Sequence, residues 1–139
     1  MRIAGAAPAQ SYLALVVVEV TSQGWTLVDT RATRKITLTD HEDPKALRDF
    51  QAAVTAFIHS YGVERILLRR GTYAGKQRSG APALKMEAVL QLLGDADLSL
   101  VPSQRATARL KKETGGVPAE LTAYQHDAFA VALTGVPER

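Results

Sequence analysis

Short apolar runs rich in β-branched residues fill the N-terminal part of the chain. The longest, Tyr12 to Val20, predicts a long and largely buried strand. Shorter runs at Arg2 to Gly5 and at Trp25 to Asp29 predict strands before and after it, beyond the turn segments APAQS and TSQG. Lys35 to Leu38 extends or adds to this hairpin system. The pattern therefore predicts three antiparallel strands at the start of the fold.

A helical periodicity follows these strands. The apolar residues that recur at three- and four-residue steps are Leu47, Phe50, Val54, Phe57, Ile58 and Tyr61. Asp43 suits the N-cap of such a helix, and Pro44 suits its first position. Gly62 suits the left-handed residue that ends it. We expect one long helix between Asp43 and Gly62.

The next part of the chain alternates between strand and helix patterns. The apolar run Arg65 to Arg69 predicts a central strand, and Leu98 to Val101 predicts a further strand. Between them, a glycine-rich basic loop, Gly71 to Ala81, precedes a helix expected from Pro82 to Gly94.

Two helices are expected near the C-terminus. The first runs from Ser103 to about Glu113. The second begins near Thr122, because Thr122 and Gln125 have the spacing of a capping box, and ends at Gly135. Strands followed by alternating helix and strand predict a mixed sheet with helices on both faces. We expect residues 1–139 to form a single domain.

Composition narrows the class of protein without naming a chemistry. The 139 residues are 46% hydrophobic and 22% charged, which suits one domain with a real core. Because cysteine is absent, disulfides and thiolate sites are excluded, and a cytoplasmic protein is expected. The net charge of +3 permits an anionic partner without requiring one. Glu19 closes the N-terminal apolar run, so neither a signal peptide nor a membrane span is expected.

Three short motifs carry a family resemblance. They are GAAPA at residues 5–9, ILLRR at 66–70 and YQHDAFAVAL at 124–133. With this order of elements, the chain resembles the ribonuclease H-like fold, and within it the RuvC-type Holliday-junction resolvases. It is also similar to small uncharacterised bacterial RuvC-like domains with a YQHDAF-like ending. The resemblance implies an α/β, ribonuclease H-like mixed five-stranded sheet with helices on both faces.

The resemblance also implies a metal site that this sequence has largely lost. Family members carry metal-binding acids where this chain has Ala7, Arg69 and Tyr124, and Asp127 alone is retained. Phosphodiester hydrolysis with two metal ions needs several carboxylates. An arginine among them puts a positive charge where a cation would bind. A catalytically degenerate domain is therefore expected, with Mg²⁺ or Mn²⁺ involved only if a rearranged site around Asp127 survives.

Asp127 and its neighbour also have plain structural interpretations. Asp127 lies at the start of the last helix, where the positive end of the helix dipole favours an anion. His126 is a general-base candidate because histidine titrates near neutral pH. It has no identifiable partner in the sequence, so a structural or exposed role is favoured.

Basic residues gather in two segments. The loop after the central strand surrounds an aromatic residue with cations: Arg69, Arg70, Tyr73, Lys76 and Arg78. The third helix carries a set spaced to share one face: Arg105, Arg109 and Lys112. Cations interleaved with an aromatic suit phosphate contacts and stacking on an unpaired base. The two sets form a nucleic-acid footprint if they lie on one side of the sheet; a solvated loop is the plainer interpretation.

Three functions remain open on these observations. The first is a degenerate RuvC-like domain that binds DNA or RNA through loop 69–78 and helix 103–113, as a homodimer by analogy with the resolvases. The second is a metal-dependent nuclease built on Asp127, helped by Glu87 or His126. The third is a protein-interaction scaffold. Salt-sensitive nucleic-acid binding, metal-dependent cleavage and a co-purifying protein partner distinguish them.

Overall fold

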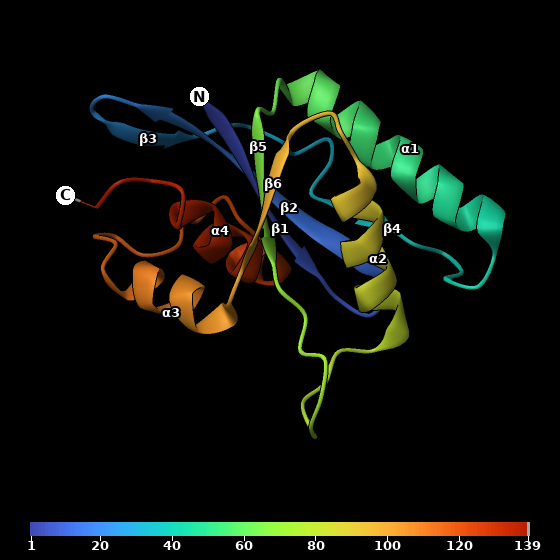
Figure 1. Ribbon diagram of the computed structural model, residues 1–139. Coiled ribbons are helices and arrows are strands. Elements are labelled where there is room, and N and C mark those ends of the chain that lie inside the picture. The colour runs from blue at the N-terminus through green and yellow to red at the C-terminus, as the bar shows by residue number, and fades with distance from the viewer. Residues whose placement is uncertain (139) are drawn as a thin grey trace.

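A computed structural model describes residues 1–138 as a twisted sheet between two layers of helices (Figure 1). The strands are β1 (Arg2–Pro8), β2 (Tyr12–Thr21), β3 (Gly24–Leu27), β4 (Lys35–Thr37), β5 (Arg65–Arg69) and β6 (Asp97–Val101). The helices are α1 (Pro44–Tyr61), α2 (Ala81–Leu92), α3 (Ser103–Lys111), the 3-10 helix η1 (Ala123–Gln125) and α4 (His126–Leu133). The predicted mixed α/β fold is confirmed.

The sheet has six strands where five were expected. Its order is β3-β2-β1-β5-β6, with β4 also paired to β2. The pairs β1–β5 and β5–β6 are parallel, and the pairs of β2 are antiparallel. Because β1 pairs with β2 from Arg2 to Pro8, β3 and β4 must share the opposite edge of β2. The 10-residue β2 is long enough to pair with both, so residues 35–37 form a separate strand.

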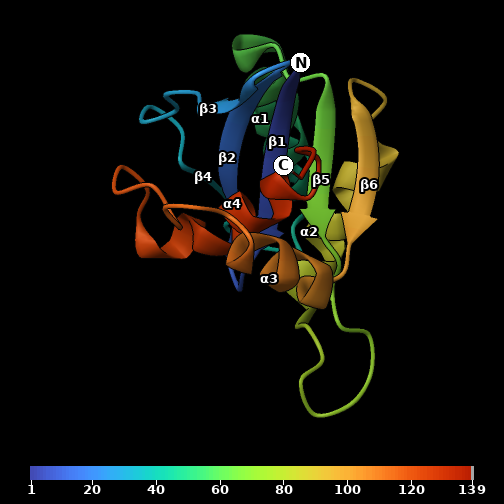
Figure 2. The same ribbon diagram turned by 90° about the vertical axis from the view of Figure 1, so that its left-hand side faces the viewer.

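Each face of the sheet has its own core. Alternate residues of a strand point to opposite faces, so Leu13, Leu15 and Val17 pack under α1 and α2. Their neighbours Val16 and Val18 belong to the core covered by α4, which α3 flanks (Figure 2). None of the helices within residues 1–138 is long and apolar enough to cross a membrane.

The predicted helix ends are largely confirmed. The Asp43 carboxylate accepts a hydrogen bond from the Lys45 N–H at 3.0 Å, and Gly62 ends α1 with φ 61° and ψ 39°. The capping box of Thr122 and Gln125 is also present. It starts a 3-10 turn, and regular α-helix begins only at His126.

Gly5 sets how closely α4 lies on β1. A Cβ added at this glycine would lie 2.0 Å from the Ala128 carbonyl oxygen and 2.7 Å from the Ala132 backbone nitrogen. Helix backbone therefore sits directly on strand backbone, in a contact that leaves no room for a methyl group. This packing fixes the start of α4 above the middle strands of the sheet.

Candidate nucleic-acid interface

Three segments that carry the family motifs meet at one edge of the sheet. β1 and β5 are parallel, and Ala6 is the partner of Leu68, so the next residues, Ala7 and Arg69, lie at the same end of neighbouring strands. The close packing at Gly5 brings the first turn of α4 to the same edge. The structure thus brings together Ala7, Arg69 and Asp127, as the motifs predict.

Arg69 connects these segments through its guanidinium. Its Nη1 donates to Asp127 Oδ2 at 2.6 Å, and its Nη2 donates to the Pro8 carbonyl oxygen at 3.0 Å. The Arg69 side chain is 31% exposed and that of Asp127 is 67% exposed. An ion pair this open contributes roughly 0.2–1 kcal/mol to stability. Its larger effect is electrostatic, because the retained acid is neutralised by an internal cation.

The residues at this edge do not fit the divalent metal that the fold family implies. Magnesium prefers several oxygen ligands in octahedral geometry, whereas Ala7 supplies a buried methyl group and Arg69 a positive charge. Within residues 1–138, no three Asp, Glu, His or Cys side chains gather in a way that could hold a metal ion. His126 is exposed at the first position of α4.

Glu87, considered above as a helper of a rearranged metal site, instead anchors the basic loop. It lies on α2 and is only 5% exposed. Its Oε1 accepts from the Gly71 N–H and its Oε2 from the Tyr73 hydroxyl, both at 2.7 Å. Arg70 lies over the Tyr73 ring, 5.1 Å from its centroid. The buried carboxylate therefore orders the beginning of the loop, and Tyr73 remains half exposed beside Arg70.

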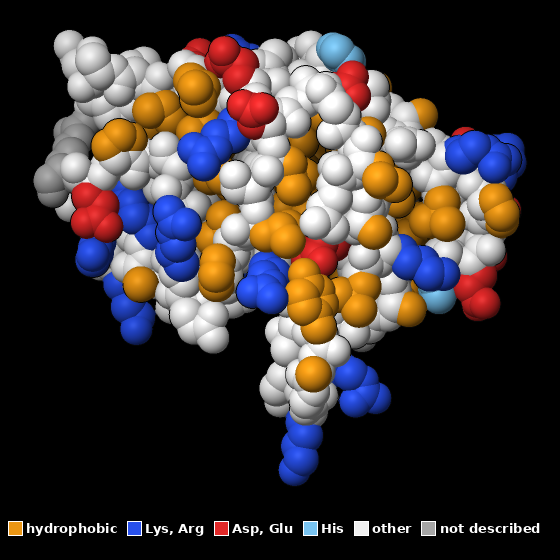
Figure 3. Space-filling model, viewed as in Figure 1, with side chains coloured by type: hydrophobic (Ala, Val, Ile, Leu, Met, Phe, Trp, Pro, Cys, Tyr) orange, Lys and Arg blue, Asp and Glu red, His pale blue; other side chains and the backbone are white. Residues whose placement is uncertain are grey.

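Beyond Tyr73 the loop projects from the sheet edge and carries basic side chains at its tip (Figures 1 and 3). Lys76 and Arg78 are exposed there. Among residues 1–138, the Arg78 side chain has one long hydrogen bond, which its Nη1 donates to the Gly75 carbonyl oxygen at 3.5 Å. These two cations can therefore contact phosphate without first breaking an ion pair with a carboxylate.

The basic residues of α3 separate into different environments. The set does share one side of the helix, since Arg105, Arg109 and Lys112 line the same hollow as Thr134 and Val136. That side faces the C-terminal segment, so Arg109 is buried at 8% exposure and its Nη1 contacts Glu113 Oε2 at 2.8 Å.

The other two members of this set, Arg105 within α3 and Lys112 just after its last residue, also differ from each other. Lys112 pairs with Glu138 at 3.3 Å, whereas Arg105 is exposed in the first turn of α3. The start of α3 adjoins the loop, because Ser103, Arg69, Arg70 and Gly71 line one hollow. Arg105 is thus the α3 cation placed to extend the loop surface.

Sequence reasoning missed residues that surround the site from β2 and β4. Tyr12 and Lys35 lie beside Tyr124, which the motif identified only as a lost metal ligand. Tyr12 and Lys35 are both far from Tyr124 in the sequence, and no local motif identifies either as a site residue. The feature that brings Tyr12 and Lys35 together is the register of β2 and β4, which pairs Tyr12 with Thr37 and Ala14 with Lys35.

Solved structures of Holliday-junction resolvases share this architecture. The Thermus thermophilus RuvC structure matches with a TM-score of 0.72 at 16% identity, covering 96% of this chain and 92% of that one. T. thermophilus RuvC in complex with a Holliday junction substrate matches with a TM-score of 0.69 at 21% identity, covering 96% of this chain and 92% of that one. The fowlpox virus Holliday junction resolvase matches with a TM-score of 0.60 at 12% identity, covering 97% of this chain and 96% of that one. The chain therefore has a RuvC-like, ribonuclease H-like fold.

Sequence comparison identifies the family. No curated protein matches the chain. The family model described as "Protein of unknown function (DUF3010)" matches residues 1–135. Since this match spans nearly the whole sequence, the chain is a member of the DUF3010 family.

Proposed function

We propose that this protein is a RuvC-like domain that binds DNA or RNA and does not cleave it. The observation that carries the proposal is the 2.6 Å contact between Arg69 Nη1 and Asp127 Oδ2. By the family resemblance, this guanidinium stands where a metal-binding acid is expected. A guanidinium can bind a phosphate through paired hydrogen bonds, but it cannot activate water. Phosphate binding is thus retained while hydrolysis is lost.

The contact surface consists of the loop cations and the start of α3. Arg70, Lys76 and Arg78 supply charge, Tyr73 supplies a ring, and Arg105 extends the surface. Arg109 is left out because it is buried against Glu113, and Lys112 has a peripheral place because it pairs with Glu138. The Holliday-junction resolvases named by the similar structures support nucleic acid as the class of partner.

Fluorescence anisotropy with labelled single-stranded, duplex and four-way-junction nucleic acids tests the binding. Replacing Lys76 and Arg78 together by alanine removes two phosphate contacts. The slope of log affinity against log salt should then fall by about 1.4 for single strands and about 1.8 for duplex. The matched control is alanine at Lys45 and Arg48, two exposed cations of α1. Undetectable binding of every nucleic acid at low salt would overturn the proposal.

A cleavage assay tests the second half of the proposal separately. The same substrates are incubated with Mg²⁺ or Mn²⁺ at high protein concentration, and no product is expected. Metal-dependent products that disappear in Asp127→Asn would establish the nuclease alternative instead. A protein that co-purifies with the chain, together with no nucleic-acid affinity, would favour the scaffold alternative.

The proposal extends to the domain organisation, assembly and location of the protein. We take residues 1–139 to act as one domain, as the shared sheet and the two cores suggest. A homodimer is proposed by analogy with the resolvases, and light scattering during gel filtration tests it. A bacterial, cytoplasmic setting accords with the absence of cysteine; fractionation of cells that express the tagged protein tests the location.

A further inference from the structure

Two tyrosines and a lysine form a compact cluster beside the Arg69–Asp127 pair. Tyr12 begins β2, Tyr124 lies in η1, and their rings meet edge to face, with centroids 5.7 Å apart and planes at 73°. The Lys35 ammonium lies 4.9 Å from the Tyr12 ring centroid and 5.1 Å from that of Tyr124. Three elements distant in sequence thus converge on one point.

The cluster lies on the same edge of the sheet as Arg69. β2 is antiparallel to β1 and pairs Leu13 with Pro8, whose carbonyl oxygen accepts the Arg69 hydrogen bond. Tyr12 is one residue beyond that pair. Tyr124 precedes Asp127 by about one helical turn, or roughly 5 Å along the axis. Both paths place the tyrosines within about 12 Å of the arginine, given a strand spacing of about 4.8 Å and a rise of about 3.3 Å per residue.

The rings and the ammonium are open to a partner. Both tyrosines are partly exposed at the rim of the core under α4, and Lys35 is exposed. In an edge-to-face pair, the ring that presents its edge keeps its own faces uncovered by the other ring. Lys35 forms no ion pair with any carboxylate among residues 1–138. Its charge is therefore held by the rings and remains available to an anion.

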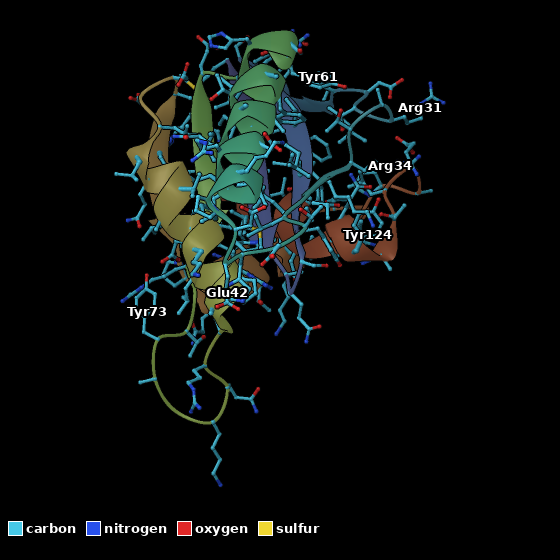
Figure 4. All side chains as sticks on the ribbon, turned by 90° about the vertical axis from the view of Figure 1, so that its right-hand side faces the viewer. Arg31, Arg34, Glu42, Tyr61, Tyr73 and Tyr124 are labelled. Carbon is cyan, nitrogen blue, oxygen red and sulfur yellow. The ribbon has the colours of Figure 1, made fainter. Side chains whose placement is uncertain are left out.

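The charged groups nearby are of both signs: two carboxylates are already paired, and the exposed Glu120 lines a hollow with Arg34 and Gln125. Asp127 is bound to Arg69, and Asp29 is bound to Arg31 at 2.8 Å, which lowers the pKa of the Asp29 carboxyl. Arg34 precedes Lys35 and lies on the side of the molecule that carries Tyr124 (Figure 4). Positive charge next to exposed aromatic rings is the combination by which proteins hold unpaired nucleotides.

We propose that Tyr12, Tyr124 and Lys35 form a second nucleotide-binding site, which takes an unpaired base on a tyrosine ring and its phosphate on the lysine. The proposal rests on the proposed function and deepens it, because it names the class of substrate as a strand with unpaired bases. Such a strand runs along the sheet edge from the basic loop, past Arg69, to the tyrosines. The domain then prefers single strands, gaps or open junction centres over continuous duplex.

The ratio of single-strand affinity to duplex affinity, measured for wild type and for each variant, tests this site. Tyr124→Leu keeps apolar volume and removes the flat ring. It should weaken binding of a single strand by about 5- to 160-fold, the range for one lost base stack, and change duplex binding less than about 2-fold. The second variant is Lys35→Gln, which removes one exposed positive charge. It should lower the slope of log single-strand affinity against log salt concentration by about 0.7.

Tyr61→Leu is the matched control. Tyr61 is a partly buried tyrosine of α1, it pairs with Phe57 at 4.8 Å between centroids, and it lies far from Tyr124 in Figure 4. Its replacement should leave single-strand binding unchanged. A single 2-aminopurine in the strand adds a stacking signal, which should be lost in Tyr124→Leu and kept in Tyr61→Leu.

The outcomes separate the two proposals. If the Lys76 and Arg78 variant loses affinity while Tyr124→Leu and Lys35→Gln bind single strands like wild type, the second site is overturned and the proposed function stands. Equal losses for single strand and duplex in Tyr124→Leu overturn base stacking as its role. Undetectable binding of every nucleic acid overturns both proposals.

Discussion

Replacing Asp127 by asparagine should tighten nucleic-acid binding, whereas for a nuclease built on Asp127 it should abolish activity. Asparagine has nearly the same shape, and its side-chain oxygen can still accept the hydrogen bond that Arg69 donates at 2.6 Å. The substitution therefore removes one negative charge and leaves the arginine in place. The local charge changes from neutral to positive beside the proposed phosphate path.

The size of the effect follows from the geometry. A phosphate that contacts the open side of the Arg69 guanidinium would lie roughly 7 Å from the Asp127 carboxylate. Two unit charges at that distance repel by about 0.6 kcal/mol in water, and by about 1.2 kcal/mol at half the dielectric constant of water. With weak screening at about 10 mM salt, this corresponds to roughly 2- to 6-fold tighter binding in Asp127→Asn. At 0.1 M salt the gain should fall to about 1.5- to 3-fold.

Anisotropy titrations of a labelled single strand at the two salt concentrations measure this change. The control is Asp49→Asn on α1, because its side chain is 65% exposed and pairs with Lys45 at 2.8 Å, which resembles the 67% exposure and 2.6 Å contact of Asp127. The control should shift affinity much less, since Asp49 lies on the helix layer of the opposite face. Unchanged or weaker binding in Asp127→Asn, with normal folding, would show that phosphate does not approach Arg69.

Three further substitutions test other parts of the structure. Gly5→Ala should destabilise the fold by about 1–3 kcal/mol or more in urea unfolding, because its methyl group would overlap the backbone of α4. Glu87→Gln should lower the free energy of unfolding by about 1–3 kcal/mol, because either the Gly71 N–H or the Tyr73 hydroxyl loses its acceptor. Hydrogen exchange should then rise at Gly71 and across the loop. Arg109→Met should lower stability by a similar amount, because it removes the pair with Glu113, while nucleic-acid affinity stays within about 2-fold of wild type; a large loss of affinity would contradict its structural role.

Features fixed by local chemistry could be predicted from the sequence. The Asp43 cap, the Gly62 end of α1 and the capping box at Thr122 depend on residues a few positions apart, and all three are present. The apolar run rich in β-branched residues from Tyr12 to Val20 also placed β2 correctly. The number of strands was wrong by one, because whether residues 35–37 continue a neighbour or pair separately depends on the register along β2.

The contacts of the site depend on long-range packing, and the sequence could not specify them. Arg69 and Asp127 are 58 residues apart, and their ion pair depends on how α4 settles over Gly5. The helical spacing of Arg105, Arg109 and Lys112 was enough to place them on one side of α3. It could not say that this side faces inward at Arg109. The motifs placed the candidate site at this edge of the sheet, and long-range packing determined the contacts of its side chains.

Under the proposed function, the bond between Arg69 and Asp127 also makes a metal site hard to build at this edge. Changing Arg69 alone to glutamate would set two carboxylates against each other at a contact that is now 2.6 Å, without a cation between them. Restoring an acid at position 7 first would place it next to an arginine that binds it as a counter-ion. Each single substitution is therefore disfavoured by itself. A metal site here would require several simultaneous changes, whereas substitutions that tune the proposed binding surface can be made one residue at a time.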